Sequence, residues 1–201
     1  MVNEFERCFS GLILPHEKKT DVFCAKEYMV AGLKKLFGDK AMWVPEYDEI
    51  EKWLKDNHGK GLLCMGEYGR GKTVMCEFIL PAIINRNDFG GGNEPTCCTL
   101  SAYSLAYTEE IPFNRGWIMI DDVGVESEQV NYGTRRILFN EIIDEAEHNK
   151  NVLILTTNLN IEELEAKYGV RTIDRLRAIT TPVIFKGESL RGRIESQYVL
   201  P

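Results

Sequence analysis

The sequence predicts an α/β fold in which a parallel sheet of five strands lies between two layers of helices. Short apolar runs alternate with segments of helical periodicity, which indicates parallel strands that are covered on both faces. Right-handed crossovers between such strands produce a three-layer sandwich. The runs that we assign to strands are 61–65, 96–100, 117–120, 152–156 and 182–185.

The composition is that of a globular protein. The chain has 201 residues, a length that suits one domain of good size or one domain with a short appendage. Of these residues 44% are hydrophobic and 27% are charged, which is a normal balance. There is no apolar run of about 18 residues and no signal-peptide pattern, so we expect a cytoplasmic protein with reduced cysteines and no membrane partner. A metal cluster of Cys8, His16 and Cys24 would match no common zinc spacing. The net charge of −7 argues against bulk electrostatic binding to nucleic acid, although residues 167–195 are basic.

We divide the chain into residues 1–42, an N-terminal arm with a helix, and residues 43–201, the main domain. Asp21 is a candidate cap for a helix that runs to Phe37, because apolar residues recur there at helical spacing. A second helix is expected at about 46–57, with proline at its entry and glycine beyond its end.

The remaining helices alternate with the strands. The helix that begins at Lys72 should end or kink at Pro81. Asn160 and Glu163 form a capping-box pattern for a helix that closes at Gly169. The other expected helices cover about 101–107, 134–149 and 173–178.

A phosphate-binding loop connects the first strand to the helix that follows it. Residues 66–73 match the pattern G-x-x-x-x-G-K-T, in which backbone N–H groups and the helix dipole hold a polyphosphate. Lys72 should reach the β- and γ-phosphates, and the Thr73 hydroxyl should bind Mg²⁺. The predicted nucleotide-binding residues of this loop are Gly66, Glu67, Tyr68, Gly69, Arg70, Gly71, Lys72, Thr73 and Val74.

Polar residues at the ends of two later strands complete a predicted hydrolytic site. Asp121 should hold Mg²⁺, and Asp122 should act as the general base that orients the attacking water. Asn158, at the end of the fourth strand, should position this water. An Asp-Asp pair can also start a turn, and an asparagine can form an Asx turn. Because the carboxyl ends of parallel strands form one ligand site, we favour the catalytic interpretation.

Arginines are concentrated near the end of the chain. Arg171, Arg175 and Arg177 lie within seven residues, and one of them could reach the γ-phosphate in a neighbouring subunit. The alternative is a solvated basic face. Arg191 and Arg193 are candidates either for phosphate sensing or for a DNA-facing stripe.

Together, residues 66–73, 118–124, 155–158, 168–175 and 189–193 resemble the AAA+ domain of bacterial helicase loaders of the DnaC/DnaI type. The pattern is also similar to that of IstB-type transposition helper ATPases. The resemblance covers roughly residues 43–195 and implies a P-loop NTPase fold, with ATP and Mg²⁺ as cofactors. It also implies a lid domain that is absent or vestigial.

The resemblance further assigns roles to the arginines. It implies that Arg175 is an arginine finger acting in trans within a homo-oligomer, that Arg171 lies beside it, and that Arg191 is the sensor-II arginine. Asp122 stands where many relatives have glutamate, which implies slow ATP hydrolysis.

The implied function is to assemble on single-stranded DNA and load a replicative helicase. The alternatives are an IstB-like transposition helper and a nucleotide-gated DNA-binding adaptor with little hydrolysis. Tyr103, Tyr107, Lys167 and Tyr168 are candidate contacts to single-stranded DNA, because aromatic and basic side chains can hold stacked bases. The first two could equally pack in the core, since they lie one helical turn apart.

Overall fold

The computed structural model describes residues 19–87, 96–105, 107, 111, 113–126, 129–131 and 134–191. Its main sheet has five strands, all parallel, in the order β2-β3-β6-β1-β7. The predicted five-stranded parallel sheet is therefore confirmed. The strands are β1 (Gly61–Gly66), β2 (Cys97–Ser101), β3 (Trp117–Val123), β6 (Val152–Thr157) and β7 (Thr180–Phe185).

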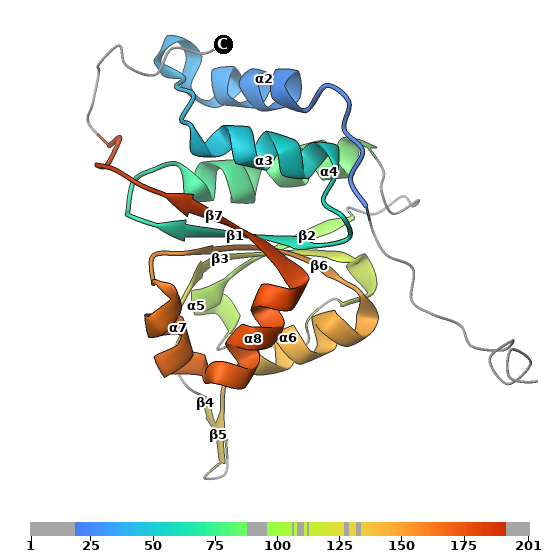
Figure 1. Cartoon of the computed structure of the whole chain (residues 1–201), viewed down its shortest axis with the longest axis vertical. Coiled ribbons are helices and arrows are strands. Elements are labelled where there is room, and N and C mark those ends of the chain that lie inside the picture. The colour runs from blue at the N-terminus through green and yellow to red at the C-terminus, as the bar shows by residue number, and fades with distance from the viewer. Residues whose placement is uncertain are drawn as a thin grey trace, which may run out of the picture.

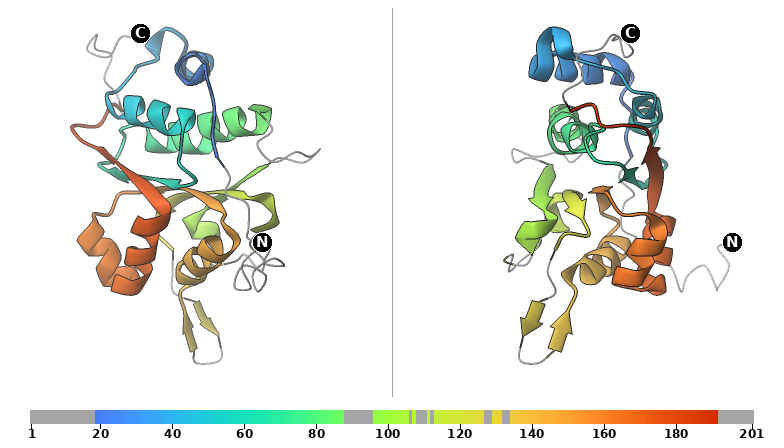
Figure 2. Two further views of the ribbon diagram at one scale, coloured as in Figure 1. Left: turned by 45° about the vertical axis from the view of Figure 1, so that its right-hand side comes forward. Right: turned by 90° about the vertical axis from the view of Figure 1, so that its left-hand side faces the viewer.

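Helices cover both faces of the sheet, so the predicted three-layer sandwich is also confirmed (Figures 1 and 2). One layer contains α3 (Glu46–Lys55) and α4 (Leu80–Asn87), which continues from the π-helix Val74–Ile79, and α2 (Ala25–Phe37) packs on the outer side of this layer. The other contains α5 (Ala102–Leu105), α6 (Leu138–Asn149), α7 (Ile161–Tyr168) and α8 (Val170–Ile179). Two short 3₁₀ helices occupy Gly38–Lys40 and Phe113–Arg115.

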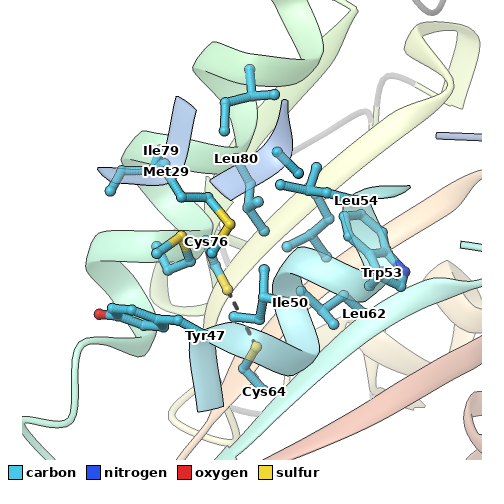
Figure 3. Close-up of a cluster of buried hydrophobic side chains, with 14 of the residues drawn as sticks. Met29, Tyr47, Ile50, Trp53, Leu54, Leu62, Cys64, Cys76, Ile79 and Leu80 are labelled. Carbon is cyan, nitrogen blue, oxygen red and sulfur yellow. Dashed lines mark hydrogen bonds between the residues drawn. The ribbon is translucent and has the colours of Figure 1, made fainter. Parts of the chain in front are cut away.

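The sheet divides the core into two apolar clusters, because successive side chains of a strand point to opposite faces. In β1, Leu62 and Cys64 belong to the cluster beneath α2, α3 and α4, whereas Leu63 and Met65 belong to the cluster beneath α5 to α8. Figure 3 shows the first cluster, in which Tyr47 and its neighbours on α3 pack over β1. Both faces of β1 are thus sealed, and its carboxyl end is held in place.

The N-terminal helix begins later than predicted. α2 starts at Ala25, and the residue before it, Cys24, makes no side-chain cap, so the predicted cap at Asp21 is wrong. The buried face of α2 belongs to the same cluster as α3 and the π-helix. The predicted boundary between residues 42 and 43 stays a prediction.

Pro81 does not end the helix after the phosphate loop. The chain is helical through Asn87, and the six residues Val74–Ile79 form a π-helix just before the proline. A proline lacks the N–H that an α-helix would use at that position, and the wider π turn relieves the missing bond. Of the two predicted outcomes at Pro81, the end of the helix is wrong, and a kink stays a prediction.

Residues 134–136 do not belong to the following helix. They form β5 (Thr134–Arg136), which pairs antiparallel with β4 (Gln129–Asn131), and α6 begins at Leu138. The β4–β5 hairpin projects from the helix layer that contains α6 (Figure 1). The capping box of Asn160 and Glu163 is confirmed, as is the end of α7 at Gly169.

Two further findings concern the described part of the chain. Within it, no helix has both the length and the apolar character needed to cross a membrane. Nor do its His, Cys, Asp and Glu side chains form a group of three or more that could hold a metal ion. Of the residues considered for a zinc cluster, Cys24 is exposed, while Cys8 and His16 lie outside the described residues.

Candidate nucleotide-binding site

The phosphate loop lies at the carboxyl end of β1, between α3 and the segment that follows β7. All three of its glycines have a positive φ: 128° at Gly66, 73° at Gly69 and 88° at Gly71. Each is also closely packed. A Cβ atom on them would lie 2.0 Å from the Phe185 carbonyl oxygen, 2.1 Å from Ser189 Oγ and 2.2 Å from Tyr47 Oη, respectively. The loop therefore requires glycine for its backbone conformation and for its packing against two neighbouring segments.

Lys72 is buried at the centre of the site. Its Nζ donates hydrogen bonds to the carbonyl oxygens of Gly66 and Glu67, at 2.7 and 2.8 Å, and to Asn158 Oδ1 at 2.9 Å. Burial lowers the pKa of this ammonium group, while the nearby carboxylate of Asp122 acts in the opposite direction. A bound phosphate would add negative charge beside Lys72 and would favour its charged form further.

Asp121 and Asp122 lie in a bulge of β3. Ile120 pairs with Leu155 and Val123 with Thr157, so the two aspartates together face Thr156. Thr156 Oγ1 donates to Asp121 Oδ1 at 2.6 Å and accepts from the backbone N–H of Asp122 at 2.9 Å. Bulges next to active sites redirect side chains, and here the bulge turns the two carboxylates to different partners.

The backbone at Asp122 explains why aspartate suits this position. Its φ is 57°, in the left-handed region. Among residues with a side chain, aspartate and asparagine are enriched in this region, because their short polar groups can bond locally. A glutamate would gain no such compensation.

Asn158 connects the loop to the acidic strand. It accepts from Lys72 through Oδ1 and donates from Nδ2 to Asp122 Oδ1 at 2.9 Å. The side chains of Lys72, Asn158 and Asp122 therefore form one continuous hydrogen-bonded chain across the ends of β1, β6 and β3. The structure thus brings these three residues together at the carboxyl ends of the strands, as predicted.

The charge around the acidic pair suits a divalent cation. Glu77, one turn beyond Thr73, has a carboxyl whose pKa is raised by burial and then by the charges of Asp121 and Asp122. Thr73 lines the same cavity as Asp122 and Lys72. Hydroxyl and carboxylate oxygens are the ligands that Mg²⁺ prefers, and Thr73 and Asp121 carry such oxygens. Their role in binding Mg²⁺ stays a prediction.

A cavity of about 560 Å³ opens beside the phosphate loop. This volume lies within the range of small-molecule sites. An apolar wall comes from the end of α2 and from residues near it, and the loop, Asp122 and Asn158 also line the cavity. Besides the loop and the polar residues Asp122 and Asn158, the cavity is lined by Leu33, Phe37, Lys40, Met42, Tyr47, Leu190 and Arg191.

Sequence reasoning missed the apolar wall. Leu33 and Phe37 were interpreted as part of a packed helix, yet Phe37 is 45% exposed. Tyr47, on α3, is buried, and its hydroxyl donates to the Gly71 carbonyl oxygen at 3.3 Å. The sequence offers no signal for this wall, because Leu33 and Phe37 both fit the apolar stripe of an amphipathic helix.

Arg70 and Arg191, two of the predicted nucleotide-binding residues, are held by hydrogen bonds to other residues of the chain. The Arg70 side chain is almost fully buried and pairs with Glu46, so its backbone N–H is what remains for a phosphate. Arg191 lines the cavity, and its backbone N–H bonds to Ser189 Oγ at 3.1 Å.

The arginines of α8 lie elsewhere. Arg171, Arg175 and Arg177 all fall within the described residues, and none of them lines this cavity. Arg175 forms ion pairs with Asp144 and Glu147 on α6, and Arg177 pairs with Glu165 at 3.0 Å. Arg171 is exposed. Neither Arg175 nor Arg171 therefore reaches the nucleotide cavity of its own chain. A catalytic role for either would have to be in the cavity of a neighbouring subunit. Arg193 lies outside the described residues.

The candidate DNA contacts separate into two groups. Tyr103 and Tyr107 are 64% and 76% exposed, with ring centroids 5.9 Å apart, so they are not core residues. Tyr168 is buried against Phe139 and bonds to the Glu126 carboxylate, and it cannot stack on a base. Lys167 is bonded to backbone carbonyls of the segment after β3.

The fold and the site together define an AAA+ domain of the P-loop NTPase type. β6 lies between β1, which carries the phosphate loop, and β3, which carries the acidic pair. A solved structure of the DnaC helicase loader is similar to the chain with a TM-score of 0.55 at 18% identity, covering 80% of this chain and 99% of that one. No protein-family model matches the chain.

The curated relatives narrow this class. The chain is 33% identical over 143 residues to the replicative helicase loader DnaC of Escherichia coli K12 and to that of Shigella flexneri. The match covers 69% of this chain and 52% of each relative, so the chain spans about half the length of the curated relatives it matches. The domain is an AAA+ domain of the DnaC/DnaI type.

Proposed function

We propose that this protein binds ATP with Mg²⁺, hydrolyses it slowly, and assembles on single-stranded DNA to load a replicative helicase. The observation that carries the proposal is the hydrogen-bonded chain Lys72–Asn158–Asp122, which lies at the edge of the cavity beside the phosphate loop. The similarity to DnaC, a replicative helicase loader, supports the choice among AAA+ functions.

The site suggests how ATP would lie. The phosphates would occupy the loop formed by residues 66–73, with Lys72 exchanging its contacts to Gly66 and Glu67 for phosphate oxygens. The base would lie against the apolar wall of Leu33 and Phe37, because ligand pockets bury apolar rings against such surfaces.

The roles of the polar residues follow from their places. Asp122 would accept a proton from the attacking water, and Asn158, which already bonds to Asp122 and Lys72, would hold this water in line with the γ-phosphate. Thr73 and Asp121 would hold Mg²⁺, which supplies charge neutralisation for the phosphates when it is bound.

The site would be completed by a second subunit. Arg175 and Arg171 lie on the outer helix α8 of this chain, and in a homo-oligomer they would act at a neighbour's γ-phosphate. An arginine that acts in trans stabilises the charge that develops during phosphoryl transfer.

The exposed pair Tyr103 and Tyr107 supports the DNA-binding part of the proposal. Exposed aromatic rings at the edge of a sheet offer stacking surfaces that tolerate any base. This pair follows β2, the edge strand of the sheet. We assign single-stranded DNA to this surface, with the helicase as the partner protein.

ATP turnover with and without single-stranded DNA tests the enzymatic part. Wild-type protein should hydrolyse ATP above the background of Lys72→Ala, because the alanine variant lacks the ammonium group that holds the phosphates. Lys55→Ala is the matched control, since Lys55 lies on the surface and pairs with Glu51 at 2.6 Å. Equal rates for wild type and Lys72→Ala would favour a nucleotide-gated adaptor without hydrolysis.

A pull-down experiment tests the partner. Stable capture of a hexameric replicative helicase in the presence of ATP would support loading. Stimulation of a transposase without helicase capture would favour the IstB-like alternative instead.

A further inference from the structure

The segment after β7 is packed against the outside of the phosphate loop. The backbone N–H of Leu190 donates to the Gly69 carbonyl oxygen at 2.9 Å. Ser189 Oγ and Arg191 Cγ would lie 2.1 and 3.2 Å from a Cβ atom placed on Gly69. The segment formed by residues 186–191 therefore crosses the loop closely, and this crossing brings Arg191 to the nucleotide cavity.

A buried ion pair lies under this crossing. The Arg70 side chain is 3% exposed and that of Glu46 is 11% exposed. Nη2 of Arg70 donates to both carboxylate oxygens of Glu46 at 3.3 Å. The pattern G-x-x-x-x-G-K-T makes no demand on the side chain at position 70. A buried arginine with a matched carboxylate at this position therefore needs its own explanation, since two charges are costly to bury.

The ion pair also binds the segment. Glu46 Oε1 accepts the backbone N–H of Lys186 at 2.8 Å, and Arg70 Nη1 donates to the Glu188 carbonyl oxygen at 3.4 Å. Glu46 is the first residue of α3, where the helix dipole stabilises a carboxylate. Three parts of the chain thus meet at one pair: the phosphate loop, the start of α3 and residues 186–191.

We propose that Glu46 and Arg70 are positioning residues that hold the segment 186–191 against the phosphate loop and thereby place Arg191 for ATP binding. The proposal rests on the proposed ATP-binding function. Each charge of the pair neutralises the other, so the pair acts through the segment rather than by contact with the phosphates. Loss of the ion pair should therefore weaken ATP binding by displacing Arg191.

A double-mutant cycle tests this dependence. Glu46→Gln keeps the size of the side chain and an oxygen for the Lys186 N–H, but removes the charge that pairs with Arg70. Binding of a fluorescent ATP analogue with Mg²⁺ is measured for Glu46→Gln in the wild-type and in the Arg191→Ala background. We expect a loss of affinity of about tenfold in the first background and less than about twofold in the second, as for residues that act as one unit.

Glu49→Gln is the matched control. Glu49 lies on the same helix, is exposed and pairs with Lys52 at 2.7 Å, so this variant should bind ATP as its parent does in both backgrounds. Equal losses from Glu46→Gln in both backgrounds, or no loss in either, would overturn the proposal. If Glu46→Gln does not fold, Arg70→Lys keeps a charge opposite Glu46 but loses the contact with Glu188, and the same dependence on Arg191 is required.

Hydrogen exchange provides a readout that needs no nucleotide. The amide of Leu190 is protected by its bond to Gly69, and Glu46→Gln should accelerate exchange in a peptide covering residues 186–191. Unchanged exchange would overturn the positioning role. Absence of ATP binding by the wild-type protein would contradict the proposed function, and the exchange measurement would still decide whether the ion pair holds the segment.

Discussion

The nucleotide site and the arginine face of α8, formed by Arg171, Arg175 and Arg177, hold their charged groups in different ways. Lys72 is 5% exposed and has three hydrogen-bond acceptors from two parts of the chain. The side chains of Arg175 and Arg177 are 27% and 51% exposed and pair with carboxylates on the surface. One region is a preorganised site, and the other carries side chains that can change partners.

This difference fits a site that is shared between two chains. A surface ion pair contributes about 0–1 kcal/mol, so Arg175 can leave Asp144 and Glu147 for a phosphate at little cost. The buried network around Lys72 cannot exchange partners so easily, because removing one group leaves another buried and unpaired. We infer that the half of the site that binds ATP is complete within one chain and that the other half is supplied on assembly.

The largest expected effect concerns the arginine face. Arg175→Ala should lower the rate of ATP turnover about 10³-fold in the assembled protein, the effect of an arginine that acts in trans, while the ATP affinity of the single chain stays the same. Turnover and equilibrium binding are measured side by side. Arg177→Ala, on the same helix and paired with Glu165, is the control and should retain activity. A loss of ATP affinity in Arg175→Ala would remove the distinction between the two regions.

A smaller effect is expected within the nucleotide site. Asp122→Asn should reduce turnover about 10²-fold, as for loss of a general base, and should leave ATP binding intact. Asparagine tolerates the φ of 57° at this position and can still accept from Asn158. Single-turnover hydrolysis separates chemistry from binding, and unchanged chemistry would assign the general base to another residue.

The exposed tyrosines give the next effect in size. Replacing Tyr103 and Tyr107 together with alanine should weaken single-stranded DNA binding about tenfold or more, because each stacked base contributes about 1–3 kcal/mol. Fluorescence anisotropy with a labelled oligonucleotide measures this. Phe23→Ala, which removes a different ring that is 91% exposed, is the control. Equal affinity for all three proteins would remove this surface from the DNA path.

The smallest expected effect is on the stability of the fold and concerns α7, the helix that precedes α8 in the chain. In the capping box of α7, the Asn160 side chain accepts a hydrogen bond from the backbone N–H of Glu163 at 2.9 Å. Asn160→Ala removes this capping box. We expect a loss of about 1 kcal/mol in the free energy of unfolding and no change in ATP affinity. Thermal unfolding with and without ATP measures both. A changed ATP affinity would show that the arginine side of the sheet and the nucleotide site are coupled within one chain.

The sequence predicted the parts of the site that depend on local pattern. The phosphate loop, the acidic pair and Asn158 follow strands, and parallel strands bring their carboxyl ends together, so their convergence could be expected from spacing alone. The places of the strands and the capping box at Asn160 were also readable, since both rest on short-range signals, although β3 and β7 are longer than expected.

The remaining features depend on contacts between distant residues. The pairing of Arg70 with Glu46 and with the Glu188 carbonyl joins positions 24 and 118 residues apart, and nothing in the local pattern indicates it. The π-helix before Pro81 and the bulge at Asp121 and Asp122 change the backbone pairing locally, and the apolar periodicity of the sequence does not indicate such changes. The wall formed by Leu33 and Phe37 was hidden because both residues fit an ordinary amphipathic helix.

Mixing two inactive variants tests the shared site most directly. Lys72→Ala lacks a working nucleotide site but keeps Arg175, whereas Arg175→Ala keeps the nucleotide site and lacks the arginine. With single-stranded DNA and ATP present, a mixture of the two should recover part of the wild-type turnover, because some interfaces combine an intact site with an intact arginine. No recovery at any mixing ratio, in a mixture shown to co-assemble, would contradict a site that is completed by the neighbouring chain.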